Sequence, residues 1–330
     1  MRSAAINCQK ARVRLSLARE RGRVRVHSKA RLNVLPRTLV LSPSWKGKAK
    51  QGASNAARTS SVTTVHGDQF RSACSRLLLA ALLPALAGCG TAADRTLEET
   101  FEQIYTIESI ANVTVINGDG AVFVYGSNTN EMRVQAIKRA YTRERLKEIA
   151  VDVSVQPGSV SINTKFPPKP KWTLFDRSGT VDYTIVVPAT VNLARVELGA
   201  GEVFVDGVRS QRMHARLRSG RMFAHNCFGK VALTLDRGAL TLAYDWWEPA
   251  KLSIQANIAH GNACAFFPTD IVCHLVAETE HGKIGNDFEE PAQRGTKEIT
   301  KTDMLIQGGG VAAVTMRAKE GNIKIVKSSP

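Results

Sequence analysis

The sequence predicts an all-β protein built as a β-solenoid, a parallel β-helix-like stack of repeats of about 20 residues. The first observation is a glycine followed by alternating apolar residues, as in Gly201 before Val203 and Val205. The second is that apolar residues also alternate before the glycine, as Val196 and Leu198 do. Period two on both sides of a glycine indicates strand, turn and strand with one buried face. The glycines concerned are Gly120, Gly201, Gly220, Gly238, Gly261, Gly282 and Gly321.

The spacing of these glycines indicates that the repeats stack. From Gly201 to Gly282 they recur at nearly equal intervals of one repeat, and Gly120 lies four such intervals before Gly201. A two-stranded unit of this length cannot bury its own apolar face, so neighbouring units must cover one another. A β-sandwich is the alternative architecture, because hairpin-rich domains also show turns roughly every 8–12 residues.

Two segments interrupt the strand pattern. Residues 141–149 favour one short helix, with Thr142 as its N-cap. Residues 151–162 again alternate as strands do, around a turn at Pro157 and Gly158. The proline-rich run 166–172 cannot continue a central strand, so we expect an exposed loop there.

The net charge of the chain is +16, which at first suggests a nucleic-acid partner. Its distribution argues against that partner. Residues 1–70 hold 15 basic against 2 acidic side chains, whereas residues 89–330 hold 28 basic against 27 acidic ones. Because the predicted folded part is nearly neutral, we expect no nucleic-acid partner for it.

A targeting segment precedes the repeats. Arg71 and Arg76 form a basic region, residues 77–86 are apolar, and Ala87, Gly88 and Cys89 follow. Ten apolar residues span roughly 15 Å as a helix, about half of the hydrocarbon core, so they cannot cross a membrane. The run Leu86-Ala-Gly-Cys89 resembles the lipobox of bacterial lipoproteins. The resemblance implies cleavage after Gly88 and lipidation of Cys89.

The same resemblance implies a location and a division of the chain. In lipoproteins of the enteric type an Asp after the lipidated Cys favours the inner membrane, so Gly90 implies the outer membrane. Because signal peptides begin a chain, we expect translation to start near Val65 rather than at Met1. A basic tail that binds nucleic acid or anionic lipid is the alternative. The expected parts are a disordered basic segment 1–64, a signal peptide 65–88, a tether 89–100 and a β-strand-repeat domain 101–330.

The repeat domain is similar to a bacterial family of β-strand-repeat domains of unknown function, the putative-adhesin family. The matching segments are Val113–Val124, Ile185–Pro188, the repeated glycine units and Gly321–Ile325. They cover about residues 101–327. The resemblance implies adhesion or surface binding, and it brings no catalytic residues to this chain. The unit at Gly282 departs from the pattern, because its second inward position is the polar Asn286.

The cysteines and histidines of the repeats allow more than one interpretation. An oxidising compartment would permit a Cys264–Cys273 disulfide across a turn, but buried free thiols are an equal alternative. His260 and His281 each precede a corner glycine, so stacking of consecutive repeats would place them roughly 5 Å apart. We favour two solvated turn residues over a metal site, and we expect no metal and no cofactor.

The aromatic group around residue 246 is the candidate binding surface. Trp246 and Trp247 lie in a predicted loop before Pro249, where exposed rings could stack on sugar rings of a cell-wall or surface glycan. Aromatic residues in such loops more often cover the edge of a core. Asp245 and Glu248 flank the pair, but one carboxylate pair is a weak sign of glycosidase chemistry.

The sequence therefore predicts a lipid-anchored, non-enzymatic envelope protein that binds or scaffolds through its strand-repeat surface. Its expected partners are the membrane, through the lipid on Cys89, and a glycan or an envelope protein. The sequence contains no Gly-x-Ser-x-Gly, His-Glu-x-x-His, Walker or Cys-x-x-Cys motif. A polysaccharide-acting enzyme on a β-helix scaffold and a passive structural protein are the alternatives.

Overall fold

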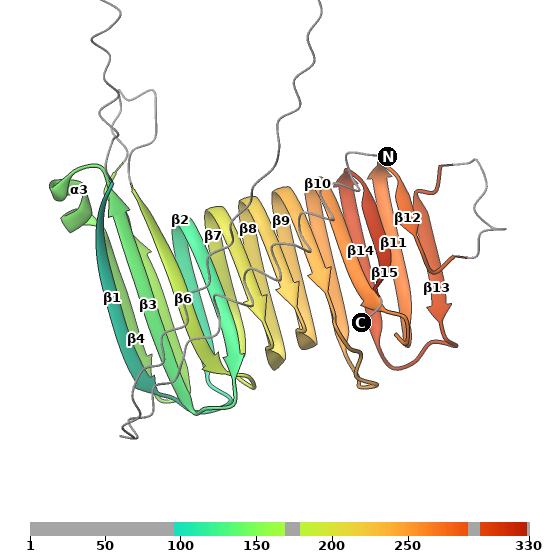
Figure 1. Ribbon diagram of the computed structural model, residues 1–330, viewed down its shortest axis with the longest axis horizontal. Helices are drawn as coiled ribbons and strands as arrows, with labels where there is room; N and C mark the ends of the chain where they lie inside the picture. Colours follow the sequence, from blue (N-terminus) through green and yellow to red (C-terminus); the bar gives the residue numbers. More distant parts are fainter. Residues whose placement is uncertain (1–95, 169–178, 290–297, 329–330) are drawn as a thin grey trace, which may run out of the picture. The chain divides into compact units, whose positions relative to one another are not determined.

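The computed structural model describes residues 96–168, 179–289 and 298–328 of the 330-residue chain. Within these ranges the structure is a mixed β-sheet of 15 strands with one short helix, which confirms the predicted all-β class (Figure 1). The predicted segments 1–64 and 65–88 lie outside the described residues, as does most of the predicted tether 89–100. The first strand begins at Leu97, inside that tether.

The strands have the following bounds in chain order: β1 (Leu97–Thr106), β2 (Asn112–Ser127), β3 (Glu131–Ala140), β4 (Ala150–Gln156), β5 (Ser159–Lys165), β6 (Thr180–Pro188), β7 (Asn192–Asp206), β8 (Arg209–His225), β9 (Phe228–Ala243), β10 (Ser253–Pro268), β11 (Cys273–His281), β12 (Ile284–Asn286), β13 (Lys301–Ile306), β14 (Ala313–Glu320) and β15 (Ile323–Ser328). The helix α3 (Arg143–Glu148) forms where a short helix was predicted. The Thr142 hydroxyl caps it by accepting a hydrogen bond from the Arg145 N–H at 3.2 Å.

The predicted corner glycines stand in register on neighbouring strands. Gly120 of β2 pairs with Gly201 of β7, which pairs with Gly220 of β8, and the same register continues through Gly238 to Gly261. Gly220 has a φ of +137°, and a Cβ placed on it would overlap the carbonyl oxygen of Gly201. Only glycine fits here, because it tolerates this φ and lets the neighbouring backbone approach.

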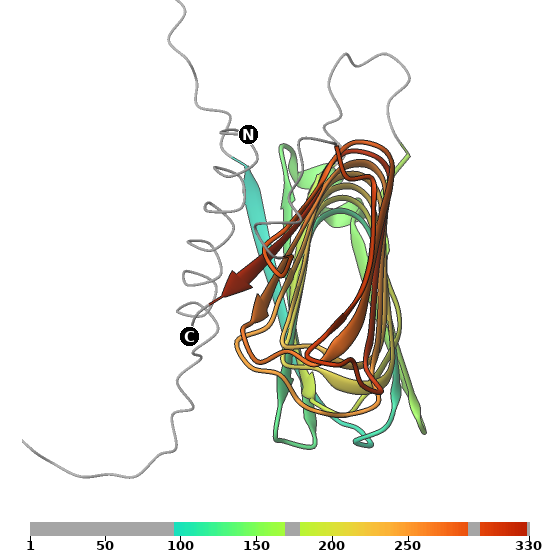
Figure 2. The ribbon, with the colours of Figure 1, turned by 90° about the vertical axis from the view of Figure 1, so that its right-hand side faces the viewer.

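Each long strand divides at its corner between two faces of the fold. In β2, residues Asn112–Ile116 pair with β5, whereas residues Gly120–Ser127 pair with β6. Strands β7 to β10 pair in parallel along both halves, and they overlie one another in Figure 2. We call the outer surface of β2 and β7–β10 before the corner glycines face A, and the outer surface after them face B.

The stack does not follow the chain order beyond β10. Strands β14 and β15 pair with β10 on one side, and with β11 and β12 on the other. Glu320 therefore lies between His260 and His281, so the prediction that the two histidines are direct neighbours is wrong. The reason is that the last strand pair of the chain inserts between two earlier ones. His260 Nδ1 lies 2.9 Å from Glu320 Oε2.

Alternating aliphatic side chains of the strands fill one continuous core. Leu217 of β8, Leu233 of β9 and Ile254 of β10 are fully buried and belong to it. Antiparallel strands close both ends of the stack: β1 pairs with β3 at one end, and β13 pairs with β11 at the other. Along β7–β10 the surface of the stack consists of the outward-pointing side chains of these strands and of the turns between them. These side chains and turns can form binding sites.

Candidate functional site

The structure separates the two tryptophans that the sequence predicts as glycan contacts. Trp247 is 8% exposed, its ring packs on Tyr244 and Phe267 with centroids 5.4 and 6.0 Å away, and its Nε1–H donates to the Val272 carbonyl at 3.1 Å. A side chain fixed in the core in this way cannot contact a sugar, so the prediction for Trp247 is wrong. Trp246 is 43% exposed and remains a candidate.

Trp246 belongs to a set of four side chains that we call the Trp246 platform: Arg209, Phe228, Trp246 and Glu248. Arg209 begins β8 and Phe228 begins β9, and the two residues pair in register. The Trp246 ring lies on Phe228, with centroids 6.0 Å apart and planes inclined by 30°. Its Nε1–H donates to Glu248 Oε1 at 3.2 Å, and Glu248 forms a 2.7 Å ion pair with Arg209. The exposed indole is therefore held in place from two sides.

Arg209 connects the charged and aromatic parts of the platform. Its guanidinium carbon lies 5.5 Å from the centroid of the Phe228 ring, within the range of a cation–π interaction. The platform therefore presents an apolar ring with a guanidinium and a carboxylate beside it. These groups suit the binding of a sugar ring. The C–H face of a sugar can pack on the indole, and its hydroxyls can form hydrogen bonds with the guanidinium and the carboxylate.

A buried histidine lies in the chain segment next to the platform. His225 ends β8 and is 8% exposed. Its Nδ1 lies 2.7 Å from Asp206 Oδ1, and its Nε2 lies 3.2 Å from Asp245 Oδ2. Burial alone would lower the pKa of His225, but hydrogen bonds and charges from Asp206 and Asp245 outweigh it and raise that pKa. Asn226 fixes Asp245 by accepting a 2.9 Å hydrogen bond from its N–H.

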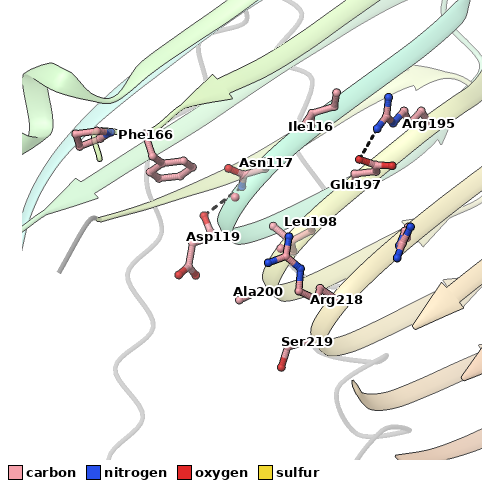
Figure 3. A pocket seen from close by; sticks show the side chains of 14 residues that line it. Ile116, Asn117, Asp119, Phe166, Arg195, Glu197, Leu198, Ala200, Arg218 and Ser219 are labelled. Atoms are coloured by element: carbon pink, nitrogen blue, oxygen red, sulfur yellow. Dashed lines mark hydrogen bonds and ion pairs between the residues drawn. The ribbon is translucent and has the colours of Figure 1, made fainter. Parts of the chain in front are cut away.

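A second candidate is a groove of about 760 Å³ on face A, shown in Figure 3. Its floor has little side-chain bulk, because Gly118 and Gly199 meet there, and a Cβ on Gly199 would overlap the carbonyl oxygen of Gly118. The predicted exposed loop contributes Phe166 and the buried Pro167 to one wall, whereas residues 169–172 of that loop lie outside the described ranges. The charged lining residues are Asp119, Arg195, Glu197, Arg216 and Arg218.

Only part of the positive charge of this groove is neutralised. Arg195 lies 2.8 Å from Glu197, and this hydrogen-bonded pair lowers the pKa of the Glu197 carboxyl. Arg216 lies 3.5 Å from Asp236, and both side chains are exposed. An exposed ion pair of this kind contributes little free energy, so it leaves the charge of Arg216 available to a ligand. Within the described part of the chain, no acidic side chain forms an ion pair with Arg218.

The cysteines of the repeats do not form the predicted bond. Cys273 has a free, buried thiol, so the predicted Cys264–Cys273 disulfide is wrong. The two side chains lie on opposite sides of the sheet. Cys273 packs in the interior core, whereas Cys264 packs with Ala243 and Phe266 on face B. The alternative of buried free thiols holds for Cys227 and Cys273.

The lipidation and cleavage positions, Cys89 and Gly88, lie outside the described residues. The groove and the His225 network were not identified from the sequence. The repeat period contained part of the signal for the groove, because Glu197 and Arg216 are one repeat apart and pair directly. The position of Phe166 beside β7 could not be predicted in this way, because Phe166 lies outside the repeats.

Comparisons with known proteins found similarity only among solved structures. No family model and no curated protein matches the chain. A putative cell adhesion protein from Clostridium sporogenes has 16% identity and a TM-score of 0.42, covering 70% of this chain and 100% of its own. A putative adhesin from Bacteroides fragilis has 9% identity and a TM-score of 0.26, covering 69% and 97%.

A third solved structure carries a different description. A putative lipid binding protein from Parabacteroides distasonis has 10% identity and a TM-score of 0.27, and it covers 69% of this chain and 97% of its own. At these identities and TM-scores, the similarities assign neither a family nor an activity to the chain.

Proposed function

We propose that this protein is a lipid-anchored, non-enzymatic binding protein of the cell envelope that holds a sugar ring on the Trp246 platform. The observation that carries the proposal is the exposed Trp246 indole, held by Phe228 beneath it and by Glu248 at its Nε1. A fixed aromatic ring loses little conformational freedom when a ligand stacks on it. Arg209 and Glu248 stand beside it as partners for sugar hydroxyls.

The proposed scaffold is a β-solenoid rather than a β-sandwich. Its support is the parallel, in-register pairing of β7, β8, β9 and β10, with a corner glycine at the same place in each strand. In a sandwich made of hairpins, consecutive strands would pair antiparallel. A solenoid places the turns that follow each repeat side by side, and this brings Arg209, Phe228 and Trp246 together.

The proposed anchor is a lipid on Cys89 at the outer membrane. The proposal rests on the apolar run 77–86 and on the lipobox-like sequence Leu86-Ala-Gly-Cys89, which begins at the last residue of that run. No described helix is long and apolar enough to span a membrane. Acyl chains on Cys89 would attach the protein stably to the membrane. A single acyl chain binds a membrane only reversibly, whereas two or more chains give stable anchoring.

Metabolic labelling with a palmitate analogue tests the anchor. We expect the wild-type protein and a Cys74→Ala control to take up the label, and a Cys89→Ala variant to lose it. Retention of the label by Cys89→Ala would overturn the lipidation site, together with the envelope location that depends on it.

A glycan array tests the binding site with the purified protein. We expect Trp246→Ala to weaken binding to cell-wall or surface glycans by about two- to tenfold, because an aromatic contact contributes about 0.5–1.5 kcal/mol. Tyr141→Ala is the matched control, because Tyr141 is also 42% exposed but lies far from the platform in the chain. Unchanged binding by Trp246→Ala, or no glycan bound by the wild type, overturns the sugar site. Shortened glycan products after incubation would favour an enzyme instead.

A further inference from the structure

Face A carries a concentration of positive charge that the composition of residues 89–330 does not predict. The groove shown in Figure 3 adjoins a second hollow of about 550 Å³ on strands β7–β10. Together their linings include five Arg and Lys side chains against two acidic ones, whereas residues 89–330 as a whole are nearly neutral. The basic residues are Arg195, Arg212, Arg216, Arg218 and Lys230.

From this arrangement we infer that face A binds a linear acidic polysaccharide, with its carboxylate groups on Arg216 and Arg218. Both arginines project from β8, two residues apart, so their side chains leave the same side of the strand. An arginine fork bonds a carboxylate through two parallel N–H groups, and this geometry makes arginine the preferred residue for such groups. The inference concerns a surface other than the Trp246 platform and does not depend on it.

The shape of face A favours a chain over a small anion. The two hollows share strands β7 and β8: His214, on the second hollow, lies two residues before Arg216, on the first. Each hollow is open and basic, so one small anion would occupy only one of them. A polymer with an acidic group on successive units can occupy both hollows. Once one unit is bound, the next unit is held near the second hollow at a high effective concentration, which increases the overall affinity.

A nucleic acid is the less suitable polyanion for this surface. Proteins that hold single strands stack the bases on several exposed aromatic rings. Among the described residues that line the two hollows, Phe166 is the one Phe, Tyr or Trp side chain. Its ring already faces Gly118, where a Cβ would lie 3.0 Å away. A nucleic acid would therefore have to bind face A through contacts to its phosphate groups alone.

Binding of the purified protein to a homopolymer of galacturonic acid tests the inference, with a neutral glucose polymer as reference. We expect the galacturonate polymer to bind, and added salt to weaken the binding because the contacts are ionic. Arg216→Ala/Arg218→Ala should weaken it by about tenfold or more. Arg216→Lys/Arg218→Lys should retain part of the affinity, since it keeps the charge but loses the fork.

Two controls separate this site from general charge and from the platform. Lys301→Ala/Lys324→Ala removes the same charge from strands β13 and β15, which line neither hollow, and should bind like the wild type. Trp246→Ala should also retain binding to the acidic polymer, so a failure of one site can be distinguished from a failure of the other. Circular dichroism of each variant checks that it is folded.

Three results would overturn the inference. They are equal binding of the galacturonate and neutral polymers, equal loss of binding in the Arg216/Arg218 and Lys301/Lys324 variants, and tighter binding of single-stranded DNA than of the galacturonate polymer. The last result would assign the surface to nucleic acid.

Discussion

His225 and Asp206 end neighbouring strands, pair in register, and place Nδ1 and Oδ1 2.7 Å apart in a largely buried position. Asp245 lies on the other ring nitrogen, so one imidazole connects segments from three consecutive repeats. Such a contact is most favourable when both ring nitrogens are protonated, since the charged ring then donates to a carboxylate on each side.

The raised pKa of His225 predicts a pH-dependent contribution to stability. Burial opposes the shift, and the hydrogen bond and charge of Asp206 together with Asp245 produce it. Because the folded-state pKa lies above the ordinary value of 6.5, the contribution is fully present below about pH 6.5 and is lost as the pH rises through the folded-state pKa. His225→Gln should therefore lower the melting temperature more at pH 5.5 than at pH 8.5. An equal loss at both pH values would contradict the charged pair.

Gly220→Ala should destabilise the fold by about 2 kcal/mol or more, because its Cβ would overlap the Gly201 carbonyl oxygen at a φ that side chains avoid. Gly285→Ala is the matched control, since a Cβ there meets nothing within 4 Å. It should change stability by about 0.5 kcal/mol at most. Urea unfolding of both variants measures the difference, and similar midpoints would contradict the tight stacking of corners.

Trp247→Ala should cost about 3–5 kcal/mol of unfolding free energy, because it empties a site packed on Tyr244 and Phe267 and leaves the Val272 carbonyl without its donor. Trp246→Ala should cost about 1 kcal/mol or less, as expected for an exposed side chain. Thermal unfolding compares the two neighbours directly. A larger loss in Trp246→Ala would reverse their assigned roles.

Cys227 and Cys273 should resist alkylation in the native protein. Burial raises the pKa of each thiol to about 12, so almost none of the reactive thiolate is present at pH 8. Peptide mapping after iodoacetamide treatment should find both residues unmodified in buffer and modified in guanidinium chloride. Rapid labelling of either residue in buffer would contradict its buried position.

The elements that follow from local chemistry could be predicted from the sequence. Gly201 and Gly220 reveal their role because each stands between two alternating apolar runs, and the Thr142 cap precedes a run of helix-favouring residues. These signals each lie within a single repeat length of chain, over which a period can be counted. The same period indicates which side chains point inward.

Features that depend on pairing between distant segments could not be predicted. The insertion of β14 beside β10 joins Ile254 to Val314, which comes several repeats later in the chain, and no local pattern distinguishes that order from a consecutive one. Trp246 and Trp247 lie outside the strands, where alternation says nothing about burial. Cys264 and Cys273 are close in the chain, but the sheet lies between their side chains, and closeness in the chain does not reveal that.

The corner register has a consequence for how proteins of this design can change. Between β7 and β8 every paired position from Val196 to Asp206 has the same offset along the chain, so residues 207–225 form one exchangeable module. Removing that module would join strands whose inward side chains already share one pattern, and duplicating it would lengthen the stack by one step. We therefore expect proteins of this design to differ in the number of such modules while keeping the antiparallel strands at the two ends, so that their surface area changes but their interior does not.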